Sequence, residues 1–205
     1  MLTLFLVRHG ETEFNATGRI QGWLDVPLNA MGERQARLVA ERFRDKPIAA
    51  LYSSSLRRAM QTAEAIARTC GLELRPDHRL REYNMGDWSG LTGEEVAAAM
   101  SVSFAHFQEQ WLQREVTIPN GETAVEVRQR VREFLQDVLI THTDGNVIAV
   151  SHGGTLGALL GEALGLPISR RHPFRFYNAS VSELIHEHHR WHLVRLNDCC
   201  HLHQT

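Results

Sequence analysis

Two short apolar runs of this chain end in the same way, with a histidine followed by a glycine. Residues 2–7 lead into Arg8-His9-Gly10, and residues 147–150 lead into Ser151-His152-Gly153. Short runs rich in Leu, Val and Ile are typical of buried strands, although periodicity alone leaves a buried helix open. If the two strands are parallel neighbours, both histidines lie beyond the carboxyl ends of the strands, where α/β folds bind their ligands.

Helical patterns separate the segments that look like strands. Asn29 is a candidate N-cap of a helix that closes at Lys46-Pro47, and a helix with an apolar stripe from Leu56 to Ala67 stops at Gly71. The other expected elements are a strand at 48–52, helices at 123–142 and about 155–164, and strands near 181–186 and 191–196. This alternation predicts an α/β fold: a three-layer αβα sandwich with a mainly parallel central sheet.

Residues 90–120 interrupt this alternation because they contain no strand pattern. Their apolar residues indicate one or two helices outside the sheet: Val96, Met100, Phe104, Phe107 and Trp111. The aromatic side chains either contact a substrate or pack as ordinary helix residues. No linker or internal repeat divides the chain, so we expect one domain over residues 1–205, with an insertion at about 90–120.

Composition narrows the class of protein. A formal net charge of −2 provides no basic field for nucleic acid. Three cysteines, Cys70, Cys199 and Cys200, form no disulfide framework, which favours a reducing cytoplasm. The first apolar run is cut by Arg8 and His9 and is too short for a signal sequence or a membrane span. We therefore expect a cytoplasmic protein that binds neither nucleic acid nor membrane.

The residues at the first strand end suit a phosphate. Arg8 supplies a permanently charged planar group that matches phosphate oxygens, and Gly10 lets backbone amides approach a ligand. His9 can be neutral near pH 7 and attack phosphorus. At the second strand end, His152 can bind a phosphoryl oxygen, and Gly153-Gly154 can open a helix with free amides. Without further information, polar strand ends that face water remain the alternative.

The motifs that follow these strand ends carry a resemblance to a known family. They are Arg8-His9-Gly10-Glu11-Thr12, then Asn15, Arg19, Gln21-Gly22, Asp25 and Pro27-Leu28; residues 53–63 with Leu56-Arg57-Arg58-Ala59; Leu80-Arg81-Glu82 with residues 86–90; residues 119–123; Ser151-His152-Gly153; and residues 178–181. Together they resemble the histidine phosphatase superfamily, in its phosphoglycerate mutase-like branch. The likeness extends from about residue 3 to about residue 202, in the family's order.

The resemblance implies a role for each residue of the site. His9 would be the nucleophile that forms a phosphohistidine, and its other ring nitrogen would be protonated and held by a backbone carbonyl. Arg8, Arg58 and His152 would bind the phosphoryl oxygens, and the two arginines would keep the imidazole neutral by charge repulsion. Glu82 would be the general acid and base. The implied substrate-binding residues are Asn15, Gln21, Gly22 and Gly153.

Two neighbouring residues are rivals for these roles. Glu11 is a weaker candidate for the acid than Glu82, and Arg57 precedes Arg58 but is expected to face solvent. The resemblance implies neither metal nor cofactor. Residues 90–120 resemble the family's small helical cap over the active site. The expected partner is a small phosphorylated metabolite, with a homodimer as the one further association left open.

Hydrolysis and phosphoryl transfer both use a phosphohistidine, and the cap helps to separate them. A mutase must return the phosphoryl group to a second acidic substrate, yet residues 91–111 contain no Lys or Arg. Residues 82–86 also depart from the mutase pattern. We therefore favour a metal-independent phosphomonoester hydrolase that acts on small metabolites. The alternatives are a phosphoglycerate mutase-type transfer, a non-catalytic phosphate-binding member of the fold, and a serine hydrolase, although no Gly-x-Ser-x-Gly occurs.

One histidine-rich segment, residues 186–190, could suggest a metal site. It is not the zinc-binding pattern His-Glu-x-x-His, because Arg190 occupies the position of the second histidine. We expect an exposed strand there.

Overall fold

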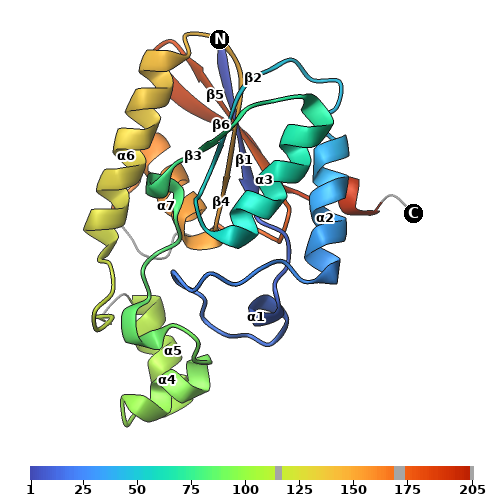
Figure 1. Cartoon of the computed structure of the whole chain (residues 1–205). Helices are drawn as coiled ribbons and strands as arrows, with labels where there is room; N and C mark the ends of the chain where they lie inside the picture. Colours follow the sequence, from blue (N-terminus) through green and yellow to red (C-terminus); the bar gives the residue numbers. More distant parts are fainter. Residues whose placement is uncertain (114–116, 169–173, 204–205) are drawn as a thin grey trace.

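A six-stranded sheet forms the centre of the protein (Figure 1). The computed structural model describes residues 1–113, 117–168 and 174–203. In spatial order the strands are β3 (Leu74–Pro76), β2 (Ile48–Ser53), β4 (Gly145–Ser151), β1 (Leu2–Arg8), β5 (Val181–Glu187) and β6 (Arg190–Asp198). The first four run parallel, whereas β5 is antiparallel to both β1 and β6. The predicted mainly parallel sheet is therefore confirmed.

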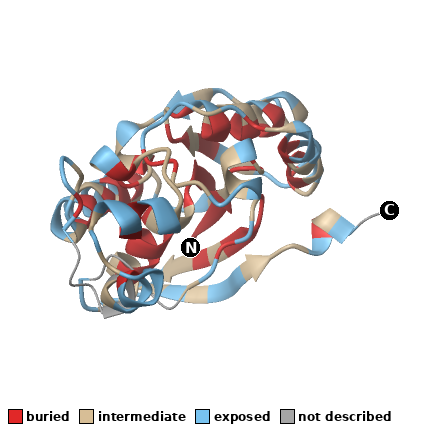
Figure 2. Cartoon of the chain, turned by 90° about the horizontal axis from the view of Figure 1, so that it is seen from below, coloured by how far each residue is buried: buried red, intermediate tan, exposed pale blue. Residues whose placement is uncertain are grey.

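Helices cover both faces of this sheet. Successive side chains of a strand point to opposite faces of the sheet. Neighbouring residues of β1 therefore pack against different helices. Leu4 belongs to the core cluster with α6 (Ala124–Thr141) and α7 (Gly153–Ala163), whereas Phe5 belongs to the cluster with α2 (Ala30–Glu41) and α3 (Arg57–Cys70). Figure 2 shows the buried residues concentrated on the central strands and on the helix faces against them. This is the predicted three-layer αβα sandwich.

Local capping signals explain most helix ends. The side chain of Asn29 accepts from the Gly32 amide and begins α2, and Gly71 ends α3 in the left-handed region at φ 67°. A capping box between Thr123 and Glu126 begins α6. Two boundaries were predicted wrongly, since α2 ends at Glu41 rather than at Lys46, and α7 begins two residues before Thr155.

The sequence patterns missed the shortest elements. These are α1 (Glu13–Ala16), β3, and the 3-10 turns His78–Leu80, Gly86–Trp88 and Cys200–His203. Each is too short to show a periodic pattern. At the other end of the sheet, His188 and His189 form the β5–β6 turn with φ of 49° and 62°, so the exposed strand expected through these two residues is wrong.

Two helices occupy the segment in which a cap was expected. They are α4 (Gly93–Ala99) and α5 (Phe104–Gln113), and both lie to one side of the sheet (Figure 1). The ring of Phe107 packs edge-on against Trp88, with centroids 5.8 Å apart, and stacks on Phe104. These aromatic residues therefore pack against one another; the side chain of Trp111 lies outside the described part. In the described ranges, no helix has the length and apolar character needed to cross a membrane.

Candidate active site

The sheet brings the two predicted histidines together. β1 and β4 are parallel neighbours in which Arg8 pairs with Ser151, so His9 and His152 follow at adjacent strand ends. Their ring centroids lie 5.0 Å apart, and both residues are buried. The predicted meeting of these two residues at one edge of the sheet is confirmed.

Hydrogen bonding determines the tautomer of His9. Its Nδ1 lies 2.6 Å from the carbonyl oxygen of Gly10. A carbonyl oxygen can only accept, so Nδ1 carries the proton and Nε2 has a free lone pair. Burial holds the pKa of His9 well below its usual 6.5, and the charges of Arg8 and Arg58 lower that pKa further. The ring is therefore neutral, and burial contributes more to its neutrality than the expected charge repulsion.

Arg58 is fixed by the loop that faces it. Its two terminal nitrogens donate to the carbonyls of Gly22 and Leu24, at 2.9 Å each. Burial lowers its pKa to about 10, so it remains a cation at neutral pH. One terminal nitrogen of Arg8 donates to the Phe176 carbonyl at 2.5 Å. The rival residue Arg57 is exposed, as expected.

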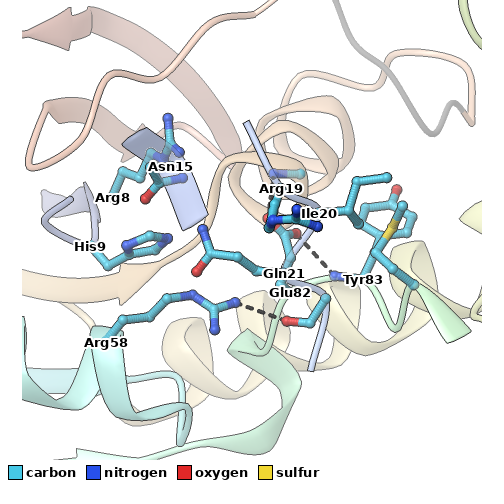
Figure 3. A pocket seen from close by; sticks show the side chains of 12 residues that line it. Arg8, His9, Asn15, Arg19, Ile20, Gln21, Arg58, Glu82 and Tyr83 are labelled. Carbon is cyan, nitrogen blue, oxygen red and sulfur yellow. Dashed lines mark hydrogen bonds between the residues drawn. The ribbon is translucent and has the colours of Figure 1, made fainter. Parts of the chain in front are cut away.

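Three buried nitrogen atoms of the site have no hydrogen-bond partner among the described residues. They are Nε of Arg8, Nε of Arg58 and Nδ1 of His152. Buried donors are nearly always paired in proteins, and those that are not often mark a binding site. The two guanidinium groups flank the ring of His9 (Figure 3). This arrangement can bind the oxygens of an anion next to His9.

Glu82 is held by the first turn of α7. Its Oε2 accepts from the Gly154 amide at 3.1 Å, and its Oε1 accepts from the amides of Tyr83 and Thr155 at 3.0 Å each. The Thr155 hydroxyl lies 3.2 Å from Oε1. The positive end of a helix attracts a carboxylate in this way. The expectation that Gly154 offers a free amide is therefore wrong, because Glu82 binds it.

A cavity of about 270 Å³ joins these groups. Its lining residues are Arg8, His9, Asn15, Arg19, Ile20, Gln21, Gly22, Arg58, Glu82, Tyr83, Met85 and Gly154. Seven of the nine predicted site residues are among them; His152 and Gly153 are not. His152 is fully buried beside His9. At the first turn of α7 it is Gly154, rather than Gly153, that lines the cavity.

The predicted substrate-binding residues Asn15, Gln21 and Gly22 differ in their contacts. The Asn15 oxygen accepts from Thr12 and Asn178, and Oε1 of Gln21 is buried with no partner among the described residues. Gly22 has φ of 50°, and a Cβ there would lie 2.9 Å from the Cβ of Met85. Glycine is therefore needed at position 22.

Four lining residues were not assigned a role from the sequence: Arg19, Ile20, Tyr83 and Met85. Figure 3 shows Ile20 and Tyr83 on the side of the cavity opposite Arg8 and His9. One end of the cavity thus has Arg8 and Arg58, and the other has Ile20 and Tyr83 together with Arg19. Arg19 stands in the family motif, and Tyr83 and Met85 follow Glu82 closely, which is the signal that could have identified them.

Two other expectations are corrected by the structure. The Gly10 amide donates to Thr62 Oγ1 rather than facing a ligand, and a Cβ at Gly10 would lie 2.5 Å from the Gly32 carbonyl oxygen. Gly10 is therefore needed for close packing against α2. The alternative acid Glu11 accepts from Asn29 Nδ2 and does not line the cavity.

The segment in which a cap was expected contacts the cavity wall at Arg19 and at Ile20, whose backbone bonds to Gly90 and Leu91. No described residue of 90–120 lines the cavity. Arg19 donates to the Gly90 carbonyl at 2.7 Å and forms an ion pair with Glu95 at 3.0 Å. Glu95 of this segment therefore pairs with a cation of the cavity wall. Within the described ranges, no group of three or more His, Cys, Asp and Glu residues is arranged to hold a metal ion.

Comparison with known proteins places this geometry in a family. The sequence profile of the histidine phosphatase superfamily (branch 1) matches residues 4–199. The chain is 40% identical over 197 residues to a protein of Serratia proteamaculans named probable phosphoglycerate mutase GpmB, covering 93% of this chain and 88% of that protein.

Two solved structures are similar over nearly the whole chain. A mycobacterial glucosyl-3-phosphoglycerate phosphatase is 32% identical, with a TM-score of 0.87 over 96% of this chain and 99% of that chain. A phosphoserine phosphatase from Entamoeba histolytica is 28% identical, with a TM-score of 0.83 over 98% of this chain and 100% of that chain. The protein therefore belongs to branch 1 of the histidine phosphatase superfamily.

Proposed function

We propose that this protein hydrolyses small phosphomonoesters through a phosphohistidine on His9. The observation that carries the proposal is the neutral His9 ring, with its Nδ1 proton bound to Gly10 and its Nε2 unprotonated, between the cations Arg8 and Arg58. Phosphoryl transfer depends mainly on positioning and on stabilising the charge of the oxygens, and these groups supply both.

The first step breaks the ester. His9 Nε2 forms a bond to phosphorus while the bond from phosphorus to the ester oxygen breaks, and the carboxyl group of Glu82 donates its proton to that oxygen. Arg8, Arg58 and His152 donate hydrogen bonds to the phosphoryl oxygens. The alcohol then leaves.

The second step releases phosphate. The Glu82 carboxylate takes a proton from water, the water oxygen attacks phosphorus, and the bond to His9 Nε2 breaks. Both residues return to their starting states. The charge of the phosphoryl group is balanced by arginines, so the reaction needs no metal, and we propose a metal-independent enzyme.

Three observations support hydrolysis over mutase activity. Residues 91–111 contain no Lys or Arg. Among the described residues, the remaining cation of the cavity lining, Arg19, is already paired with Glu95. A cavity of about 270 Å³ is at the small end of ligand sites and suits a small metabolite. The substrate proposed is therefore a small monoester, without a second anionic group that needs a dedicated cation. The three free cysteines fit a reducing compartment, and we place the enzyme in the cytoplasm.

Trapping the intermediate tests the proposal. The protein is mixed with a phosphorus-labelled monoester and quenched, and the adduct is mapped by mass spectrometry under alkaline conditions that preserve phosphohistidine. We expect label on His9, no label in His9→Ala, and unchanged label in the exposed control His192→Ala. A 3-phosphoglycerate isomerisation assay runs in parallel. Label on another residue, turnover by His9→Ala, or isomerisation that exceeds hydrolysis contradicts the proposal.

A further inference from the structure

The second histidine of the site has an unusual pair of neighbours. His152 Nε2 lies 2.7 Å from the hydroxyl of Ser54, the residue that directly follows β2. On the other side of the ring, Nδ1 is buried with no partner among the described residues. Both His152 and Ser54 are fully buried. The direction of the hydrogen bond between them therefore decides whether Nδ1 is a donor or an acceptor.

The direction of this hydrogen bond follows from counting the polar groups that each arrangement leaves unpaired. The Leu56 amide donates to Ser54 Oγ at 3.3 Å, so this oxygen already accepts one hydrogen bond. If the Ser54 hydroxyl donates to His152 Nε2, its single hydrogen is used, and the ring proton resides on Nδ1. If Nε2 donates instead, the hydroxyl hydrogen has no acceptor among the described residues, and Nδ1 is still without a partner. The first arrangement thus leaves one buried polar group unpaired and the second leaves two, which is less favourable.

We propose that Ser54 is a positioning residue that holds His152 as the Nδ1–H tautomer, so that this ring is a neutral hydrogen-bond donor to the bound phosphoryl group. The tautomer follows from the contacts of Ser54 alone. Its role toward the phosphoryl group rests on the function proposed above.

The charged and titratable groups around His152 favour a neutral donor. Arg8 and His9 face it from the end of β1, Arg58 from α3 and Arg130 from α6. Burial, followed by these charges, holds the pKa of His152 well below 6.5. A ring that cannot readily become an imidazolium can donate from Nδ1 only in this one tautomer. Ser54 would thus decide whether His152 Nδ1 is a donor or an acceptor toward the bound anion.

Nitrogen NMR of the free protein tests the tautomer directly. Long-range proton–nitrogen spectra of the 15N-labelled protein are recorded at pH 7 to 8, and the His152 signals are assigned by their loss in His152→Asn. We expect Nδ1 to be protonated and Nε2 to be unprotonated. The reverse pattern would overturn the proposal, whether or not the protein turns over any monoester.

Binding of orthovanadate tests the consequence, again without turnover. Ser54→Ala removes the donor to Nε2, and the ring can then place its proton on Nε2 and present a bare Nδ1 to the anion. Losing one hydrogen bond to a charged group should weaken vanadate binding by about tenfold to a hundredfold at pH 8. The loss should shrink as the pH falls, because protonation restores the Nδ1 proton.

Ser53→Ala is the matched control. Ser53 is an equally buried neighbour whose hydroxyl donates to the Ser54 carbonyl at 2.9 Å, and the change leaves the contact between Ser54 and His152 intact. We expect its vanadate affinity to be close to that of the parent at every pH. Equal losses in the two alanine variants, or a loss in Ser54→Ala that does not depend on pH, would show a merely structural role and overturn the proposal.

Discussion

The carboxylate of Glu82 and the amide of Gly154 are in hydrogen-bond contact at 3.1 Å, and the contact leaves no room for a side chain at position 154. A Cβ there would lie 2.6 Å from a Glu82 oxygen and 2.9 Å from the ring of Tyr83. The glycine at the start of α7 therefore places the proposed general acid, rather than presenting a free amide to substrate.

Replacing this glycine should displace Glu82. In Gly154→Ala we expect kcat on alkyl phosphates to fall by about a hundredfold, because a catalytic group that is misplaced by about 1 Å loses most of its effect. Gly153→Ala is the matched control: its Cβ would come no nearer than 3.8 Å to Arg8, so Glu82 should stay in place. Steady-state kinetics and a crystal structure of each variant check this. A parental kcat in Gly154→Ala would show that Glu82 needs no such placement.

The acid role of Glu82 should depend on the leaving group. Glu82→Gln removes the transferable proton and keeps the size of the side chain. We expect kcat/KM to fall by about 100-fold to 10,000-fold for alkyl phosphates. The loss should be much smaller for p-nitrophenyl phosphate, whose phenolate leaves without a proton. The ratio of the two losses is the measurement, and a ratio near one would exclude Glu82 as the acid.

The buried His9 should make stability depend on pH. Below pH 6.5, the usual pKa of histidine, the unfolded chain binds a proton on this residue and the folded protein does not. The free energy of unfolding therefore falls as the pH falls, by about 1.4 kcal/mol per pH unit for each such histidine.

Urea denaturation between about pH 5 and pH 6.5 measures this slope. His9→Gln should reduce it by up to about 1.4 kcal/mol per pH unit. His192→Gln, at an exposed position, is the control. A slope that is the same in His9→Gln and in the parent protein would mean that His9 is protonated in the folded state.

Arg130 of α6 should stabilise the segment that carries Glu82. It binds both carboxylate oxygens of Glu122, at 3.0 and 3.1 Å, and donates to the carbonyls of Arg79 and Glu82. A lysine cannot make these contacts together. We expect Arg130→Lys to lower the free energy of unfolding by about 2 kcal/mol and to lower kcat more than it changes KM.

The same helix offers a control for Arg130. Arg132 pairs with Glu162 at the surface, where an ion pair contributes little. Arg132→Lys should therefore leave both stability and kcat nearly unchanged. If the two variants behave alike in thermal unfolding and in kinetics, the contacts of Arg130 with the Glu82 segment are unimportant.

The pair between Arg19 and Glu95 should disfavour substrates with a carboxylate. Glu95→Gln keeps a side chain that can cap α4 and removes the charge that neutralises Arg19. We expect KM for 3-phosphoglycerate to fall by about threefold relative to p-nitrophenyl phosphate, with a smaller effect in high salt. Glu94→Gln, next to it on the exposed face, is the control. Parallel changes for the two substrates would show that Arg19 does not meet the substrate.

The features that could be predicted from the sequence are those that short segments encode. Asn29 begins α2 and Gly71 ends α3 through contacts within one turn. The apolar runs before His9 and His152 need only a neighbouring strand to become buried. Arg58 and Glu82 were assigned to the site by the family motifs. Their positions in the sequence alone would not have identified them. Helix α1 and strand β3 were missed because four and three residues carry no period.

By itself, the sequence determined the layers of the fold and the chemical groups at the strand ends, because caps, strand alternation and residue type act locally. Only the tertiary structure decided which of those groups remain available to a ligand. The Gly154 amide is taken by Glu82, the Gly10 amide by Thr62, and the charge of Arg19 by Glu95. Each partner lies tens of residues away in the chain, and hydrogen bonds over such separations depend on how the layers pack.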